Sequence, residues 1–179
     1  KDKEVQVEQK RFILIETNST ENVKVNDEKD PLWWIPVTYT TSNDLEFNNT
    51  KPSLWMKATR SIKFEEDIDA TDWIIFNTQV AHYYRVNYDL KNWKLITDYL
   101  NDPVKYSDIP PVNRAQLLSD AMNLARAGAD ILDYTVALDV TKYLKHERDY
   151  MPWKTAINDL FYIDSMLIRS SDYHLMKVI

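Results

Sequence analysis

One histidine–glutamate pair, His146-Glu147, comes closest to the metal-binding motifs of hydrolytic enzymes. In H-E-x-x-H, two imidazoles one helical turn apart bind zinc and the glutamate acts as general base. The fifth position here is Tyr150, so the pair has no second imidazole on that face. His82 and His174 are distant in sequence and lack ligand spacing. We therefore expect no metal ligand in this chain.

Other catalytic arrangements find equally little support. Ser119, Asp120 and His146 contain the groups of a hydrolase triad, but Ser119 lies within a predicted helix and not on the sharp strand-to-helix turn that presents a nucleophile. The acidic run 65–69 lacks the alternating oxygens and turn glycine of a calcium loop, so we interpret it as a solvated loop. A single glycine excludes a glycine-rich phosphate cradle. The sequence predicts no catalytic residue.

Two Asn-x-Ser/Thr tripeptides are candidate modification sites. Asn18 and Asn48 each begin one, in polar stretches between apolar runs where a glycan would have room. Such tripeptides also occur by chance, so the sequence leaves glycosylation open.

Composition limits the class of protein. The chain has 179 residues and a net charge of −6, with 44% hydrophobic and 28% charged residues, which is typical of a globular protein. It has no basic face suited to a phosphate backbone, so we expect no nucleic-acid partner. The absence of cysteine excludes disulfides and thiolate zinc clusters. No apolar run approaches the ~18 residues that a membrane span needs.

The elements that must position these residues change character near residue 88. Residues 1–88 predict a β-sandwich of short antiparallel strands, because aromatic and β-branched runs recur about every ten residues between polar loops. The predicted strands are 4–16, 32–40, 54–58, 60–65, 72–78 and 82–88.

Residues 89–179 predict an all-α domain that begins an α-solenoid, a superhelical stack of helices. Asp89 is a good N-cap for a first helix. Asn113, with Gln116 three residues later, resembles a capping box for a second, and Gly128 suits its left-handed end. A third helix is expected near Asp133, and a fourth from Pro152, with an apolar stripe from Trp153 to Ile168.

The residues around this join are predicted to have structural roles. They are Tyr84, Arg85, Asn87, Tyr88, Asn113, Arg114 and Asp120. Each arginine could instead hold a substrate carboxylate, but an arginine at such a join more often pairs with an acidic neighbour, and Asp120 is a plausible partner for one of them.

Several strings resemble one family, the zinc-dependent gluzincin aminopeptidases of the membrane alanyl aminopeptidase type. They are 8–12 (EQKRF), 33–41 (WWIPVTYTT), 72–77 (DWIIFN), 83–89 (YYRVNYD), 92–93 (NW), 109–128 (IPPVNRAQLLSDAMNLARAG), 134–144 (YTVALDVTKYL) and 147–156 (ERDYMPWKTA), in collinear order. The resemblance implies a C-terminal fragment: the β-sandwich and the first helices of a domain that closes over the active-site cavity. His82 stands where the family usually has glycine, so we expect a different backbone in the preceding turn.

The resemblance also implies a zinc cofactor and peptide substrates for the parent enzyme, with the catalytic domain upstream and further helices downstream. The sequence of residues 114–144 resembles those of the insect midgut branch of the family, whose members are lipid-anchored glycoproteins on the outer face of the plasma membrane. Some of them are receptors for bacterial crystal toxins. Two alternatives are therefore a binding module for a toxin or antibody, and a scaffold from a non-catalytic paralogue.

Overall fold

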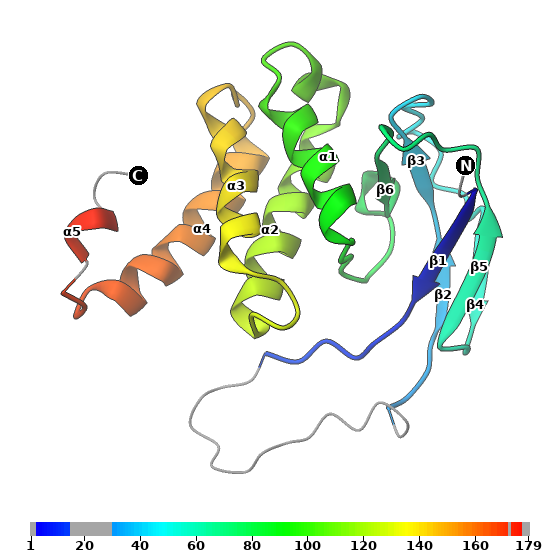
Figure 1. The fold of residues 1–179 in the computed structure, drawn as a ribbon, viewed down its shortest axis with the longest axis horizontal. Helices are drawn as coiled ribbons and strands as arrows, with labels where there is room; N and C mark the ends of the chain where they lie inside the picture. Colours follow the sequence, from blue (N-terminus) through cyan, green and yellow to red (C-terminus); the bar gives the residue numbers. More distant parts are fainter. Residues whose placement is uncertain (1–2, 15–29, 172, 177–179) are drawn as a thin grey trace.

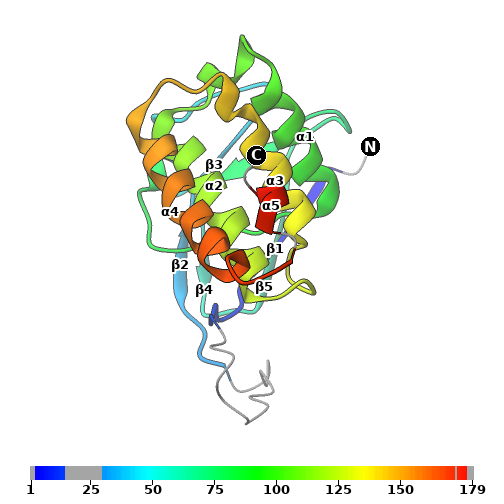
Figure 2. The same cartoon turned by 90° about the vertical axis from the view of Figure 1, so that its left-hand side faces the viewer.

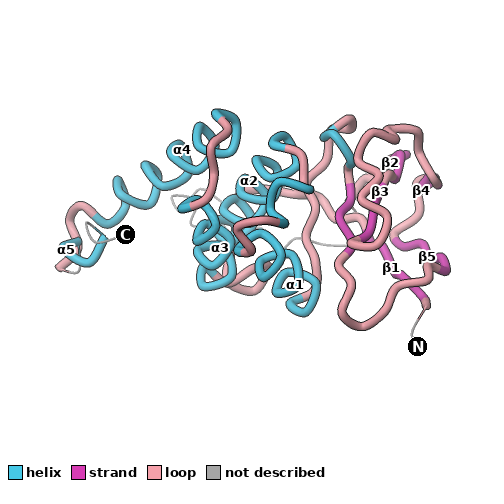
Figure 3. The backbone as a smooth tube through the Cα atoms, turned by 90° about the horizontal axis from the view of Figure 1, so that it is seen from above, coloured by secondary structure: helices cyan, strands magenta, loops and turns pink. Residues whose placement is uncertain are grey.

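The computed structural model describes residues 3–14, 30–171 and 173–176. Short strands lie at one end and helices at the other (Figure 1). Seen from above, the strands and helices form two separate regions joined by loop segments (Figure 3). The order of β elements followed by α elements agrees with the sequence prediction. The division into two domains between residues 88 and 89 stays a prediction.

The described strands form three two-stranded antiparallel sheets. Their pairs are β1 (Glu4–Glu8) with β5 (Ser61–Glu65), β2 (Trp34–Val37) with β4 (Leu54–Lys57), and β3 (Tyr39–Thr41) with β6 (Ile74–Phe76). Pro36 lies opposite Trp55 in the second pair, and Thr38 separates β2 from β3. The antiparallel pairing was predicted, whereas the arrangement into a complete sandwich stays a prediction.

Alternation along β2 and β4 buries one face of that pair, whereas all three residues of β6 are buried. Val37, Met56, Ile74 and Phe76 form a small core, against which the apolar side chains of β1 and β5 pack. The opposite face of the β2–β4 pair is exposed and carries Trp34 and Trp55, because successive side chains of a strand point to opposite sides.

The predicted strand 82–88 is wrong. This segment is described and belongs to no strand. Its polar backbone atoms bond to side chains instead of a neighbouring strand: the Val86 N–H donates to Asp120, and the His82 carbonyl accepts from the Asn77 amide. Strand-like composition alone could not reveal these partners, which lie outside any strand.

The described helices are α1 (Leu90–Asn101), α2 (Pro111–Ala127), α3 (Tyr134–Thr141), α4 (Tyr150–Leu167) and α5 (Tyr173–Met176), with 3-10 turns η1 (Thr78–Val80), η2 (Lys105–Asp108) and η3 (Lys142–Lys145). The predicted Asp89 cap is confirmed, and the third helix begins next to Asp133 as predicted. The Asp89 side chain accepts from the Asn92 N–H of α1, and the Asp133 side chain accepts from the Thr135 N–H of α3. The fourth helix begins at Tyr150, two residues before the predicted Pro152.

Both ends of α2 differ from the prediction. The N-cap is Pro110, without a side-chain cap, so the proposed capping box of Asn113 and Gln116 is wrong. The end at Gly128 has φ 155° and ψ 144°, a conformation open almost only to glycine but not the predicted left-handed helical one. A Cβ at this position would lie 2.5 Å from the Asp130 carboxylate oxygen.

One large core joins the two regions. Phe47, Trp73 and Ile75 from the β region pack with Trp93 and Leu118 of α1 and α2. Helix α2 packs against both α3 and α4, and Figure 2 shows it lying behind them. Since Trp73 and Trp93 are both almost fully buried, the region that contains β6 shares its core with the helices.

Helix α4 packs one side on α2 and extends away from the other helices (Figures 1 and 3). Its predicted apolar stripe is largely exposed among the described residues, with Trp153 at 38%, Ile157 at 42% and Phe161 at 67% exposure. Ala156, on the packed side, is buried. The arrangement of these helices into a longer solenoid stays a prediction.

Candidate functional site

The segment between β6 and α1 is fastened to helix α2 by one carboxylate. The Arg85 guanidinium donates to an Asp120 carboxylate oxygen at 3.0 Å, and the Val86 N–H donates to the other oxygen, also at 3.0 Å. Arg85 further donates to the Ser119 hydroxyl and carbonyl. Arg85 and Asp120 thus form the ion pair considered in the sequence analysis, and both oxygens of the carboxylate have partners.

Burial dominates the electrostatics of this pair. The Asp120 side chain is 5% exposed, and loss of solvation raises its pKa to about 6, although Val86 and Arg85 both favour the charged form. Burial also raises the pKa of Asp159, on α4, to about 6, partly offset by the nearby charges of Arg85 and Arg126. Two carboxylates with raised pKa values therefore lie near Arg85 at the α2–α4 contact.

Of the other predicted residues of this segment, Tyr88 contacts both regions, whereas Asn87 bonds to residues of the helical region. The Asn87 side-chain oxygen accepts from the Trp93 indole N–H at 2.9 Å, while the Asn87 side-chain nitrogen donates to the Ile131 backbone carbonyl at 3.0 Å. The Tyr88 hydroxyl accepts from the Phe76 N–H, and burial raises the Tyr88 pKa. Burial likewise raises the pKa of Tyr84 to about 12. All three side chains have packing or hydrogen-bonding environments, and the tyrosine shifts favour the neutral phenol.

Asn113 holds a strained turn. Asn77, Gln79 and Val80 all have positive φ, between 51° and 63°, which is unusual for residues other than glycine and above all for a β-branched one. The Asn113 side chain accepts from the Gln79 N–H at 2.9 Å and donates to the Asn77 carbonyl at 3.1 Å. His82, where the family has glycine, has no positive φ. The left-handed conformation therefore falls earlier in the turn.

Arg114 forms a buried ion-pair cluster. Its Nε and Nη2 donate to the two oxygens of Glu147 at 2.7 and 2.9 Å, and Nη2 also donates to Asp149 at 2.7 Å. The Arg114 and Glu147 side chains are 2% and 0% exposed. Burial tends to raise the Glu147 pKa, but the hydrogen bonds from Arg114 and two backbone N–H groups outweigh it, so the net pKa is lowered.

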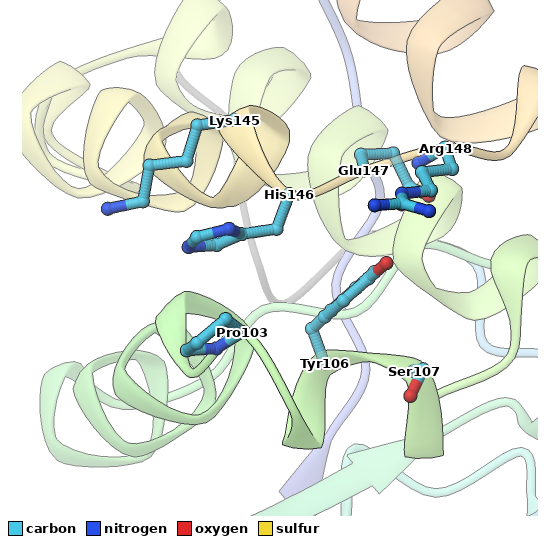
Figure 4. A pocket seen from close by; sticks show the side chains of 7 residues that line it. All are labelled: Pro103, Tyr106, Ser107, Lys145, His146, Glu147 and Arg148. Carbon is cyan, nitrogen blue, oxygen red and sulfur yellow. The ribbon is translucent and has the colours of Figure 1, made fainter.

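This cluster lies behind a polar pocket of about 410 Å³. Figure 4 shows the side chains around it, with His146 and Tyr106 at its centre. The pocket is lined by Pro103, Tyr106 and Ser107 from the α1–α2 connection and by Lys145, His146, Glu147 and Arg148 from the α3–α4 connection.

The described residues do not fit the zinc that the family resemblance implies. Both Glu147 oxygens are held by Arg114, so they are not free to bind a cation or activate water. Among the described ranges, no cluster of three or more His, Cys, Asp or Glu could hold a metal ion. Ser119 and Asp120 bond to Arg85, and His146 makes no hydrogen bond with either in the part of the chain described.

The two sequons have different positions. Asn18 lies outside the described residues. Asn48 lies in a turn between β3 and β4, and its side chain is exposed, as is that of Thr50. The geometry therefore leaves the Asn48 amide accessible.

Two residues that contribute to the join were not predicted. Asn92 accepts from the Ile74 N–H at 3.0 Å and donates to the Ile74 carbonyl at 2.8 Å. Asn77 donates to His82 and accepts from its N–H. Asn92 could have been noticed, because an amide lies beside Trp93 on the predicted buried face of α1, whereas the Asn77 contacts have no pattern in the sequence.

In the described residues, a β region and α-helical hairpins are joined by polar side chains, and no set of catalytic groups comes together. This defines a domain in which short antiparallel strands are followed by packed helices. Residues 73–178 match the ERAP1-like C-terminal domain, and the chain belongs to this family. Among the helices described, none is long and apolar enough to cross a membrane.

The relatives are much longer than this chain. It is 37% identical over 173 residues to aminopeptidase N of Plutella xylostella, which covers 96% of the chain and 17% of that protein. It is 34% identical over 169 residues to aminopeptidase N of Homo sapiens, covering 94% and 16%. It is 39% identical over 127 residues to the membrane alanyl aminopeptidase of Manduca sexta, covering 71% and 12%. The chain thus spans about a sixth of the first two.

Proposed function

We propose that this chain is the non-catalytic portion of a zinc-dependent aminopeptidase that removes N-terminal residues from peptides. The observation that carries the proposal is the match of 96% of the chain to 17% of an aminopeptidase N. In this proposal the chain links the catalytic domain to the helical domain and forms part of the substrate-cavity wall. Zinc belongs to the parent enzyme, bound outside this chain.

The polar join supports the linking role. Arg85 and Val86 bind Asp120, and Asn92 binds both polar backbone groups of Ile74, so residues on either side of the predicted boundary at 88 are held together. A linker built this way transmits the position of one region to the other. Its tyrosines and arginines need no direct contact with substrate for this role.

Two exposed apolar faces support contacts with further parts of the parent. Trp34 and Trp55 lie on the open face of the β2–β4 pair, and Trp153 and Phe161 lie on the open side of α4. Contiguous apolar surface of this kind marks interaction sites. We propose that the upstream catalytic domain covers the first face and downstream helices cover the second.

The test uses both the chain and its parent. The purified chain, with added zinc, should not hydrolyse an aminoacyl chromogenic substrate. In the full-length parent, Arg85→Gln should lower peptidase activity while leaving the zinc content unchanged, and Lys51→Gln, an exposed change of equal charge, should have no effect. Chelator-sensitive hydrolysis by the isolated chain, or equal effects of the two variants, would contradict the proposal.

Localisation follows from the same assignment. We propose that the parent is a glycoprotein on the extracellular face of the plasma membrane, held there by a GPI anchor as in the insect midgut branch. The accessible Asn48 amide supports a glycan on this chain. Mass spectrometry of the protein from its natural source, with and without amide-linked glycan removal, tests Asn18 and Asn48 separately.

The alternative function is a binding module. The exposed tryptophans of the β2–β4 face and the Asn48 turn favour a surface that a toxin or antibody could recognise. Binding of a bacterial crystal toxin to glycosylated and unglycosylated chain would discriminate, because a receptor epitope must bind in the absence of the catalytic domain. The paralogue alternative is decided by the upstream sequence: an intact H-E-x-x-H indicates an enzyme and a degraded one a scaffold.

A further inference from the structure

Around the pocket between η2 and the start of α4, the acidic side chains have partners within the chain and the basic side chains that line it do not. Its acidic neighbours are all engaged within the chain. Glu147 and Asp149 bind Arg114, Asp102 accepts from two backbone N–H groups, and Asp108 accepts from the Tyr99 hydroxyl. Each of these four carboxylates therefore has a hydrogen-bond partner within the chain.

The basic side chains of the pocket are not engaged in this way. Lys145, His146 and Arg148 line the opening, and none has a side-chain hydrogen bond or ion pair within the described part of the chain. Of these three side chains, His146 also lies near Asp102 in the adjacent loop: the Val104 and Lys105 N–H groups lower the pKa of Asp102 most, and the nearby Lys105 and His146 side chains lower it further.

The floor of the pocket is rigidly positioned. Tyr106 packs its ring 5.2 Å from the Arg114 guanidinium and 6.4 Å from the His146 ring. The backbone of the opposite wall is fixed because the Arg148 and Asp149 N–H groups both donate to the buried Glu147 carboxylate. Figure 4 shows the Tyr106 hydroxyl directed toward Glu147 and Arg148 across the opening.

We propose that this pocket binds a small oxyanion, that is, a carboxylate or phosphate group. The Arg148 guanidinium offers a planar pair of donors that matches such oxygens. Figure 4 shows Lys145 directed to the other side of His146, so its ammonium adds positive charge to the opening and not a second donor to the same group. The Tyr106 hydroxyl can donate from the floor. The polar lining and a volume of about 410 Å³ suit a hydrophilic group and not a large apolar ligand. The inference does not depend on the peptidase assignment.

The experiment titrates the full 179-residue chain with inorganic phosphate and, separately, with succinate. Amide chemical shifts are followed by NMR at constant ionic strength, with chloride as the balancing anion. We expect saturable shifts centred on residues 145–148, and about tenfold weaker binding in the double variant Lys145→Gln/Arg148→Gln. The matched control, Lys51→Gln/Lys91→Gln, removes two exposed and unpaired lysines elsewhere in the described chain. It should bind the anions as tightly as the unmutated chain does.

Two peptides identify the source of a carboxylate: one with a free C-terminus and the same peptide amidated. Preference for the free form assigns the site to a peptide terminus, and saturation by phosphate or succinate alone assigns it to a free ion. The proposal is overturned if no probe gives saturable shifts, or if the control variant loses as much affinity as the pocket variant. Both variants alter exposed side chains, and an unchanged urea midpoint verifies that each is folded.

Discussion

Replacement of Arg114 by methionine should strongly destabilise the chain. Methionine keeps most of the apolar stem but removes every donor of the guanidinium. Glu147 would then keep the backbone N–H groups of Arg148 and Asp149 but lose both hydrogen bonds from Arg114, while its side chain stays fully buried. The variant therefore leaves a buried carboxylate without its cation, and it also removes the hydrogen bond from Arg114 to the buried Ile109 carbonyl.

The magnitude follows from this geometry. Removal of one partner of a buried ion pair costs about 3–5 kcal/mol, because the remaining charge stays desolvated. A domain of this size is stable by roughly 5–15 kcal/mol, so the loss is a large share of the total. Asp149 is different, since its side chain is 54% exposed and solvent can replace Arg114. For Asp149→Asn we expect a cost of about 1 kcal/mol or less.

Urea unfolding at pH 7, followed by circular dichroism, measures these differences as shifts in the midpoint at unchanged slope. The matched control is Lys94→Met, which breaks the exposed pair of Lys94 with Asp98 and should cost about 0.5 kcal/mol or less. In a double-mutant cycle, Arg114→Met combined with Glu147→Gln should be more stable than the sum of the single changes by about 2 kcal/mol. A cost no larger than the Lys94 control, or no coupling in the cycle, would refute the argument.

Four further outcomes are expected. Val80→Gly should stabilise the chain by about 0.5–1 kcal/mol, since glycine adopts φ 51° without strain, and a lower urea midpoint would contradict this. Gly128→Ala should destabilise it by about 1–3 kcal/mol because of the φ of 155°, since the exposed Asp130 side chain can move away from the added methyl group, and thermal unfolding would detect the loss. Burial raises the pKa of Asp120 to about 6 in the folded state from about 3.8 in the unfolded state, so between these pH values the folded state binds one more proton. The contribution of Asp120 to the free energy of unfolding therefore falls by up to about 3 kcal/mol as the pH rises from 3.8 to 6. The difference in unfolding free energy between the wild type and Asp120→Asn, measured across this range, should show that slope. The isolated chain should self-associate through α4, and sedimentation should show less association after Phe161→Glu; a clean monomer at high concentration would exclude it.

Local patterns predicted the elements well. Asp89 and Asp133 mark helix starts because a cap bonds to a residue two or three positions away, so both partners appear in one short stretch. The aromatic and β-branched runs likewise predicted the strands that contain Val37 and Met56. These elements depend on residues that are close in sequence, so a short stretch of the sequence is enough to predict them.

The predictions that were wrong concern residues whose partners are distant in sequence. Residues 82–88 have the composition of a strand, yet the bond of Val86 goes to Asp120, which is 34 positions away. Asn113 was assigned to a helix cap, but its side-chain oxygen accepts from the Gln79 N–H, also 34 positions away. Arg114 could not be matched with Glu147 before the α3–α4 connection was placed beside α2. Contacts of this range depend on how the helices pack, and no local pattern specifies them.

These long-range contacts also account for how the two regions are joined. Asn92 of α1 bonds to Ile74, Asn113 of α2 bonds to Gln79, and Asp120 of α2 bonds to Val86. In each case a helix side chain satisfies a backbone N–H of the β region or of the segment after it, where a neighbouring strand would otherwise do so. Because three such bonds come from two helices, and because a shared core lies beneath them, rotation of one region against the other would leave several buried groups unpaired at once. The join is therefore built as a rigid connection, which is the property that a linking domain needs.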